Sequence, residues 1–94
     1  MKVRENYSCR RFDCAFPKAA ANEFGEMFIR EIKAGVQIEM LRSGPMVIKY
    51  RAYPNVIHEI LLIEEKHADR IIKQISEISA KHPIDPEEYH GFGD

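Results

Sequence analysis

The stretch that decides the fold spans residues 36 to 53 and reads Val36-Gln37-Ile38-Glu39-Met40-Leu41-Arg42, then Ser43-Gly44-Pro45, then Met46-Val47-Ile48-Lys49-Tyr50-Arg51-Ala52-Tyr53. Apolar residues recur at every second position on each side of Ser-Gly-Pro, which is typical of two antiparallel strands and a short connection. We therefore expect a hairpin that turns at residues 43–45 and is followed by a second turn at Pro54-Asn55. Its core face would carry Val36, Ile38, Met40, Met46, Ile48, Tyr50 and Ala52, and its other face Gln37, Glu39, Lys49, Arg51 and Tyr53.

A strand and a helix are expected before this hairpin. In residues 3–16 the apolar side chains change parity near Arg10-Arg11, which predicts a bulge there, or else pairing of Tyr7 to Phe16 alone. Pro17 is suited to open a helix, and Gly35 to end it. The helix would bury a face at helical spacing that consists of Ala20, Ala21, Phe24, Met27, Phe28 and Ile32.

The segment after the hairpin is ambiguous, because Ile60-Leu61-Leu62-Ile63 is apolar at both parities. A fourth strand over residues 56–64 is favoured by its β-branched residues, and the alternative is one long helix from Asn55 to His82. In either case a helix covers residues 66–81 and stops before Pro83. The remaining residues, 83–94, predict a tail that docks partly through Ile84, Tyr89 and Phe92.

These elements predict an α+β fold of order β-α-β-β-β-α, with a four-stranded, mainly antiparallel sheet and both helices packed on one face. Residues 1–82 would form a single domain and residues 83–94 the tail. A strand that is apolar on both sides must be covered on both. We expect Leu61 and Ile63 to lie on the face without helices and to form a homodimer contact there.

Composition limits the function classes. The net charge is −1, but residues 1–53 hold ten basic and six acidic side chains while residues 54–94 hold four and nine. This asymmetry favours attraction within the fold or across a dimer over a general affinity for nucleic acid. No apolar run is long enough to span a membrane and no signal-peptide core begins the chain, so we expect a cytoplasmic protein with no membrane partner. Cys9 and Cys14 fit reduced thiols.

The sequence contains no recognisable catalytic constellation. The four histidines lack the spacing of metal sites, the cysteines lack a Cys-x-x-Cys pair, and Gly91-Phe92-Gly93 is too short for a phosphate loop, so we expect no catalytic residue, metal or cofactor. A small-ligand or metal site near His58 remains an alternative. Arg10 and Arg11 follow directly after Cys9 and would favour a thiolate there, although strand packing explains both thiols more simply.

Binding of another macromolecule is therefore the leading hypothesis, with a protein as the expected partner of a homodimer. The alternative is RNA, bound by a basic and aromatic sheet face made of Arg10, Arg11, Lys49, Arg51 and Tyr53.

The helix–three strands–helix order from Pro17 to His82 resembles double-stranded-RNA-binding domains, whose last helix starts with basic residues. Here that start reads Glu64-Glu65-Lys66-His67-Ala68-Asp69, so the resemblance implies a topology and not that function. The strand and Pro-Lys-Ala-Ala helix start also resemble histidine-containing phosphocarrier proteins. Their phosphorylated histidine precedes this helix, whereas the first histidine here is His58.

Overall fold

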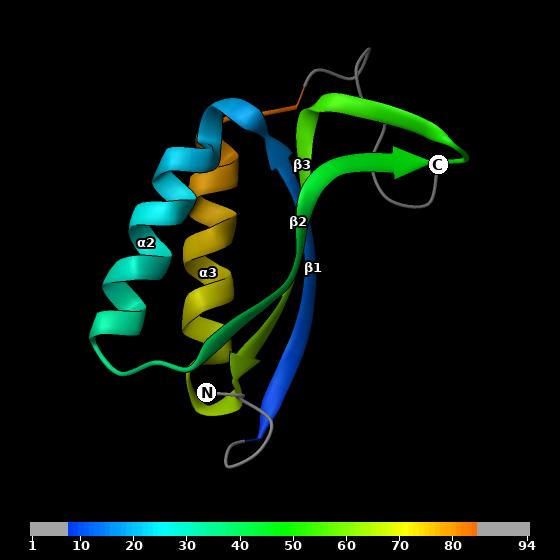
Figure 1. The fold of residues 1–94 in the computed structure, drawn as a ribbon. Helices are drawn as coiled ribbons and strands as arrows, with labels where there is room; N and C mark the ends of the chain where they lie inside the picture. The colour runs from blue at the N-terminus through cyan, green and yellow to red at the C-terminus, as the bar shows by residue number, and fades with distance from the viewer. Residues whose placement is uncertain (1–7, 85–94) are drawn as a thin grey trace.

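The computed structural model describes residues 8–84, which form one antiparallel sheet with two helices on one face (Figure 1). The elements are β1 (Cys9–Pro17), a single 3-10 turn η1 (Lys18–Ala20), α2 (Ala21–Lys33), β2 (Ile38–Ile48), β3 (Arg51–Glu64) and α3 (Glu65–Lys81). The strand order is β1-β3-β2. Since β1 and β2 both run antiparallel to β3, they are parallel to each other and joined through α2, a split β-α-β arrangement. The predicted α+β class is confirmed.

The sheet has three strands where the sequence predicted four, because residues 51–64 form one continuous strand. The predicted turn at Ser43-Gly44-Pro45 is wrong, and so is the turn at Pro54-Asn55, since these residues lie inside β2 and β3. Register shifts fall between Met40 and Arg42 and between Pro45 and Met46. A proline is tolerated at such irregularities on an edge strand, which is the position of β2.

The chain actually reverses at Lys49 and Tyr50, between the ends of β2 and β3. The ambiguous segment 56–64 is a strand, as favoured, and the helix after it starts at Glu65, one residue before its predicted start. Gly35 follows α2 with a φ of 100°, which confirms its role at the helix end.

β1 is regular from Cys9 to Pro17 and pairs with β3 without a register shift, so no bulge occurs at Arg10-Arg11. Phe12, Cys14 and Phe16 therefore point to the helices, and Cys9 points to the opposite face of the sheet, which no described helix covers and which we call the uncovered face. Val3 and Tyr7, and most of the predicted tail with Tyr89 and Phe92, lie outside the described residues.

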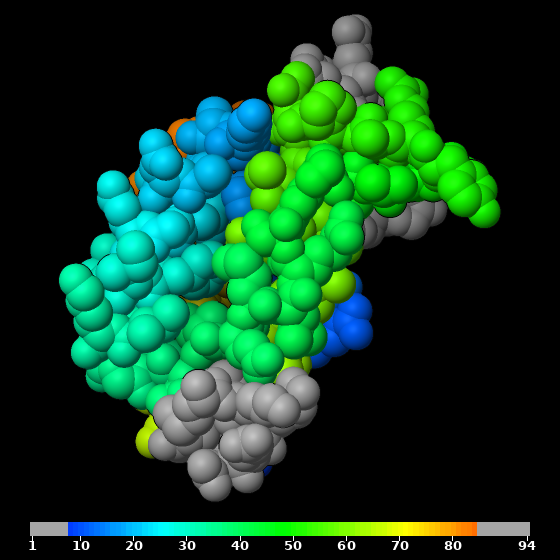
Figure 2. Space-filling view, in the orientation of Figure 1, coloured from blue at the N-terminus to red at the C-terminus, as the bar shows by residue number. Residues whose placement is uncertain are grey.

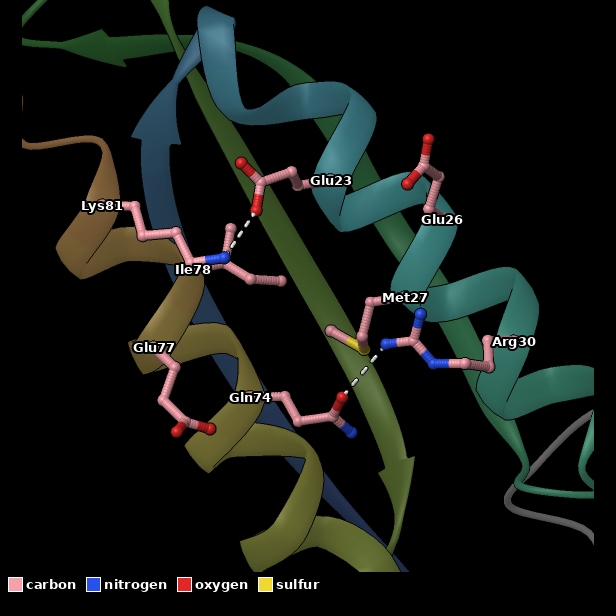
Figure 3. Close-up of a pocket in the computed structure, with 8 residues that line it drawn as sticks. All are labelled: Glu23, Glu26, Met27, Arg30, Gln74, Glu77, Ile78 and Lys81. Atoms are coloured by element: carbon pink, nitrogen blue, oxygen red, sulfur yellow. Dashed lines mark hydrogen bonds and ion pairs between the residues drawn. The ribbon is translucent and has the colours of Figure 1, made fainter.

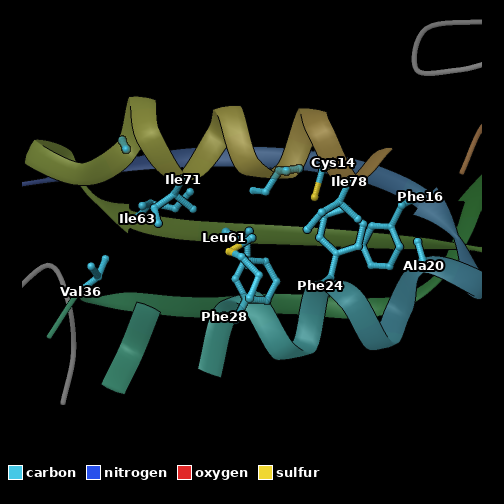
Figure 4. Close-up of a cluster of buried hydrophobic side chains, with 13 residues drawn as sticks. Cys14, Phe16, Ala20, Phe24, Phe28, Val36, Leu61, Ile63, Ile71 and Ile78 are labelled. Carbon is cyan, nitrogen blue, oxygen red and sulfur yellow. The ribbon is translucent and has the colours of Figure 1, made fainter. Parts of the chain in front are cut away.

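The core lies between the helices and the sheet (Figure 4). The Phe16 and Phe24 rings sit 4.1 Å apart at their centroids and close one end of it. Leu61 and Ile63 are 0% exposed within this core. The expected facing of these two residues was therefore wrong: they lie under the helices, and neither side chain reaches a surface where a second copy could contact it. Ile60 and Leu62, at the other parity, lie on the uncovered face.

Polar contacts join the two helices to each other and to the sheet. The buried Glu31 carboxylate of α2 accepts hydrogen bonds of 2.7 Å from both Arg70 and Gln74 of α3. Arg10 of β1 forms ion pairs with Glu65 and Asp69 on the opposite side of α3. One side of α3 therefore faces α2, and the opposite side faces the β1 edge of the sheet. Within residues 8–84, no helix is long and apolar enough to cross a bilayer.

Candidate nucleic-acid interface

The far end of the β2–β3 hairpin bends away from the helices and projects from the body of the molecule (Figures 1 and 2). We call residues 42–58 the arm. After the second register shift its strands pair as Met46 with Tyr53, Val47 with Ala52 and Ile48 with Arg51. The increased twist that accompanies such irregularities explains why the arm leaves the plane of the sheet.

The tip of the arm is made of two bulky residues in a conformation that they rarely adopt. Lys49 has a φ of 49° and Tyr50 a φ of 67°. A two-residue hairpin turn with positive φ at both positions is the type I′ turn, which favours Asn-Gly or Gly-Gly. Each non-glycine residue held there costs about 1–2 kcal/mol. Strain of this kind is common where a side chain serves a function, and the Tyr50 side chain is fully exposed.

A second, smaller core supports the arm. Met46 and Val56 are almost completely buried, and Ala15, Ile48, Tyr53 and Ile84 pack against them. Ile84 comes from the segment after α3, so the end of the described chain contributes to this support. Packed side chains therefore hold the arm in its position relative to the sheet.

The charge of the arm is all positive. Between Glu39 and Glu59 the sequence has no acidic residue and three basic ones, Arg42, Lys49 and Arg51. The Arg51 guanidinium carbon lies 4.9 Å from the centroid of the Tyr53 ring, within the range of a cation–π contact. Cations and aromatic rings thus alternate along the tip, although the whole chain is nearly neutral.

Two hydrogen bonds orient the Arg42 side chain at the base of the arm. Its Nε donates to His58 Nδ1 at 3.1 Å, and its Nη2 donates to the Pro45 carbonyl at 3.1 Å. Burial, together with the Arg42 charge, lowers the pKa of His58, so the imidazole is neutral near pH 7. The guanidinium remains the charged group at this position.

The five residues predicted to form the RNA-binding face fall into separate groups. Lys49, Arg51 and Tyr53 lie together on the arm. Arg10 and Arg11 lie at the opposite end of the sheet, where β1 begins beside the end of β3. Arg10 faces the helices and pairs with Glu65 and Asp69, whereas Arg11 on the other face pairs with Asp13. The structure therefore does not bring all five onto one surface.

His58 does not stand among metal-ligand residues. Arg42 occupies its Nδ1, and the neighbouring Glu59 points to the other side of the strand. Within residues 8–84 no group of three or more His, Cys, Asp or Glu side chains is arranged to hold a metal.

The thiol of Cys14 is unsuited to nucleophilic chemistry. Burial raises its pKa to about 12, with contributions from the charges of Glu59 and Asp13. Glu59, its partner across β1 and β3, is 6% exposed and accepts a hydrogen bond from the Ser43 hydroxyl at 3.1 Å. Burial raises the pKa of Glu59 as well, and the Ser43 contact opposes this shift. We interpret the pair as a polar inclusion in the core.

A groove of about 390 Å³ lies between α2 and α3 (Figure 3). Its charged side chains are mixed in sign: Glu23, Glu26, Arg30, Glu77 and Lys81. Lys81 pairs with Glu23 at 3.2 Å and Arg30 donates to Gln74 at 3.3 Å across the groove. These contacts join the two helices, and the groove offers no convergent set of groups for a ligand.

Comparison with known protein families, curated proteins and solved structures finds no match to this chain. Two residues of the arm were not identified from sequence: Arg42, because it was placed at the end of a strand just before the predicted turn, and Tyr50, because strict alternation assigned it to the core. The absence of acidic residues between Glu39 and Glu59 was the signal that could have marked the arm.

Proposed function

We propose that this protein is a non-catalytic binding protein whose arm binds single-stranded RNA. The observation that carries the proposal is the tip of the arm, where the fully exposed Tyr50 stands between Lys49 and Arg51, and the arm, residues 42–58, contains no acidic residue. Single-stranded nucleic acids are bound by such combinations, because cations contact the phosphates and aromatic rings stack on the bases.

The arrangement also supports a preference for single strands over duplexes. A duplex keeps its bases stacked on one another, so Tyr50 would find no base face, whereas an unpaired strand offers one at every nucleotide. The backbone strain at Lys49 and Tyr50 is in accord with this role, since it holds a bulky ring outward at a position where glycine is the ordinary choice.

The test is fluorescence anisotropy with a labelled oligouridylate of about 12 nucleotides, titrated at several salt concentrations. With up to three cations engaged, the slope of log K against log salt should be about −2 for the single strand. Lys49→Ala/Arg51→Ala should reduce the slope to about −0.7, and Tyr50→Ala should weaken binding about 5- to 100-fold. A DNA strand and a duplex of the same length show whether the sugar and the pairing matter.

Lys33→Ala/Lys73→Ala is the matched control, because it removes the same charge from exposed positions on the helices. If both double variants lose affinity equally, the net charge and not the arm is responsible. If the wild type binds no strand even at low salt, the RNA proposal is rejected and the protein partner favoured by the sequence is the remaining hypothesis.

A further inference from the structure

The two outer edges of the sheet differ in how well they are protected. β2 is interrupted by Pro45 and by two register shifts, which are devices that discourage pairing with another strand. β1 is regular along its whole length, has no lysine, and has no proline before its last residue. Among the described residues it pairs with β3 alone, so no described strand occupies its second edge.

The core is also incomplete along this edge. Phe12 of β1 and Ile72 of α3 are only partly buried, although both pack against the main core. Glu65, Asp69, Ile72 and Ser76 share one side of α3 because they are three or four residues apart. Since Arg10 reaches Glu65 and Asp69, this is the side that faces the β1 edge.

Phe12 and Ile72 lie at nearly the same height along the edge. β1 and α3 run in the same direction, because both are antiparallel to β3 (Figure 1). Phe12 is two residues beyond Arg10 in β1, which is a rise of about 7 Å along the strand. In α3 the same rise takes about four to five residues. Counted from the turn between Glu65 and Asp69, which Arg10 contacts, this rise leads to Ile72. A two-fold axis that runs beside Phe12, midway between two β1 strands, therefore passes close to Ile72.

We propose that β1 pairs with β1 of a second copy, antiparallel and centred on Phe12, to form a continuous six-stranded sheet. Under this register Arg11 of each copy lies opposite Asp13 of the other on the uncovered face. Opposite charges that face each other across strands are stabilising, and the two-fold axis produces the contact twice. On the helix face, Phe12 and Ile72 would each meet their own counterpart and close the core.

The contact between α3 helices is sterically reasonable. α3 packs against both β1 and β3 and so lies above the space between them. With strands about 4.8 Å apart, the two α3 axes would then be about 10 Å apart, which is an ordinary helix-packing distance. The small side chain of Ser76 on the facing side permits this approach.

The charges on β1 allow a test that leaves the core intact. Arg11 and Asp13 are exposed and pair along the strand within one copy, with Nε to Oδ1 at 3.0 Å. Arg11→Asp makes the strand acidic at both positions, and Asp13→Arg makes it basic at both. Each single variant should dimerise about 30-fold more weakly than the wild type, because two attractive contacts become repulsive. Their equimolar mixture should form a heterodimer, and the double variant R11D/D13R should regain the homodimer.

Sedimentation velocity gives the dissociation constants and native mass spectrometry identifies the heterodimer by its mass. Lys73→Glu, on an exposed part of α3 away from the β1 edge, is the control and should dimerise as the wild type does. A wild type that stays monomeric overturns the proposal. So does a dimer that survives either single reversal, or a mixture that does not associate. None of these results depends on RNA, so the dimer and the proposed function succeed or fail separately.

Discussion

The Arg51 guanidinium lies against the ring of Tyr53, 4.9 Å from its centroid, on one face of β3. Residues two apart in a strand point to the same side, so the pair forms without bending the backbone. A cation–π contact at an exposed site contributes about 0.5–1 kcal/mol, which is enough to bias the arginine toward one orientation. The charge of Arg51 is therefore biased toward one place on the arm.

The strained turn at Lys49 and Tyr50 predicts that a variant with a relaxed turn is more stable but binds RNA more weakly. Lys49→Asn/Tyr50→Gly installs the residues that a type I′ turn prefers and should raise the free energy of unfolding by about 1–3 kcal/mol. The same variant should lose RNA affinity, because the exposed ring and a cation are gone. Thermal unfolding followed by circular dichroism measures the first effect and anisotropy the second. An unchanged or lower melting temperature would show that the turn is not strained.

Glu59 predicts a pH dependence of stability. Burial raises its pKa above the ordinary 4.5, so the folded state favours the protonated carboxyl. Its contribution is fully present at low pH and is lost as pH rises through the raised folded value. Glu59→Gln, which can still accept the Ser43 hydrogen bond, should be more stable than the wild type at pH 7 and lose this advantage near pH 4. Urea unfolding of both proteins across this range is the measurement. A difference in unfolding free energy between the two proteins that does not change with pH would contradict the raised pKa of Glu59.

Glu31 predicts the opposite dependence. The Arg70 guanidinium lowers the pKa of Glu31, which is buried between α2 and α3. Its stabilising contribution is therefore present at neutral pH and lost as pH falls through the lowered folded value. Arg70→Ala should destabilise the protein at pH 7 by about 1–2 kcal/mol, a value reduced for the half-exposed arginine. Lys73→Ala on the same helix should change stability little. Equal effects of the two substitutions would argue against the Glu31 contact.

Cys14 should be inert in the folded protein. It is buried and its pKa is raised to about 12, so almost no thiolate exists at neutral pH. Iodoacetamide at pH 7.5 should leave Cys14 unmodified in the native protein and alkylate it in urea. Peptide mass spectrometry distinguishes Cys14 from Cys9. Rapid native labelling of Cys14 would show that the β1–β3 core opens readily.

Sequence reasoning located both helices because each carries strong signals. However, Pro17 ends β1 and α2 begins only at Ala21, after a 3-10 turn, and Ala21 and Ile32 of the predicted buried face are exposed. The apolar face of α2 includes Phe24, Met27 and Phe28, and Gly35 supplies the positive φ after it. For α3, Ala68, Ile71, Ile75 and Ile78 recur at helical spacing. In both helices the periodicity marked the buried face, whereas the sequence alone left the start of α3 open, because one long helix from Asn55 was the alternative to the strand that the structure has there.

The hairpin was misplaced because local turn signals disagreed with the sheet. Ser43-Gly44-Pro45 has the composition of a turn and serves as an irregularity of an edge strand, while the true turn uses Lys49 and Tyr50, which signal no turn at all. A residue in a strained conformation cannot be predicted from its ordinary preferences. The same error hid the arm, since its tip was assigned to the middle of a regular strand.

The sequence does not show which side chains of β3 face the helices, because both parities are apolar in Ile60-Leu61-Leu62-Ile63. Pairing with β1 decides it: Phe12 lies opposite Leu61, so Leu61 and Ile63 face the helices. The sequence therefore placed Leu61 and Ile63 on the wrong face of the sheet. Of the predicted binding residues, Lys49, Arg51 and Tyr53 lie together because they are close in sequence, whereas Arg10 and Arg11 required knowledge of the sheet order.

The most direct test of the arm as the RNA-binding element is an NMR titration of ¹⁵N-labelled protein with the oligouridylate. We predict that amide shifts concentrate in residues 42–58, with the largest changes at Lys49, Tyr50 and Arg51, and that the helices remain unaffected. Shifts centred on the helices or on the start of β1, or no shifts at a saturating strand concentration in low salt, would contradict the proposed function.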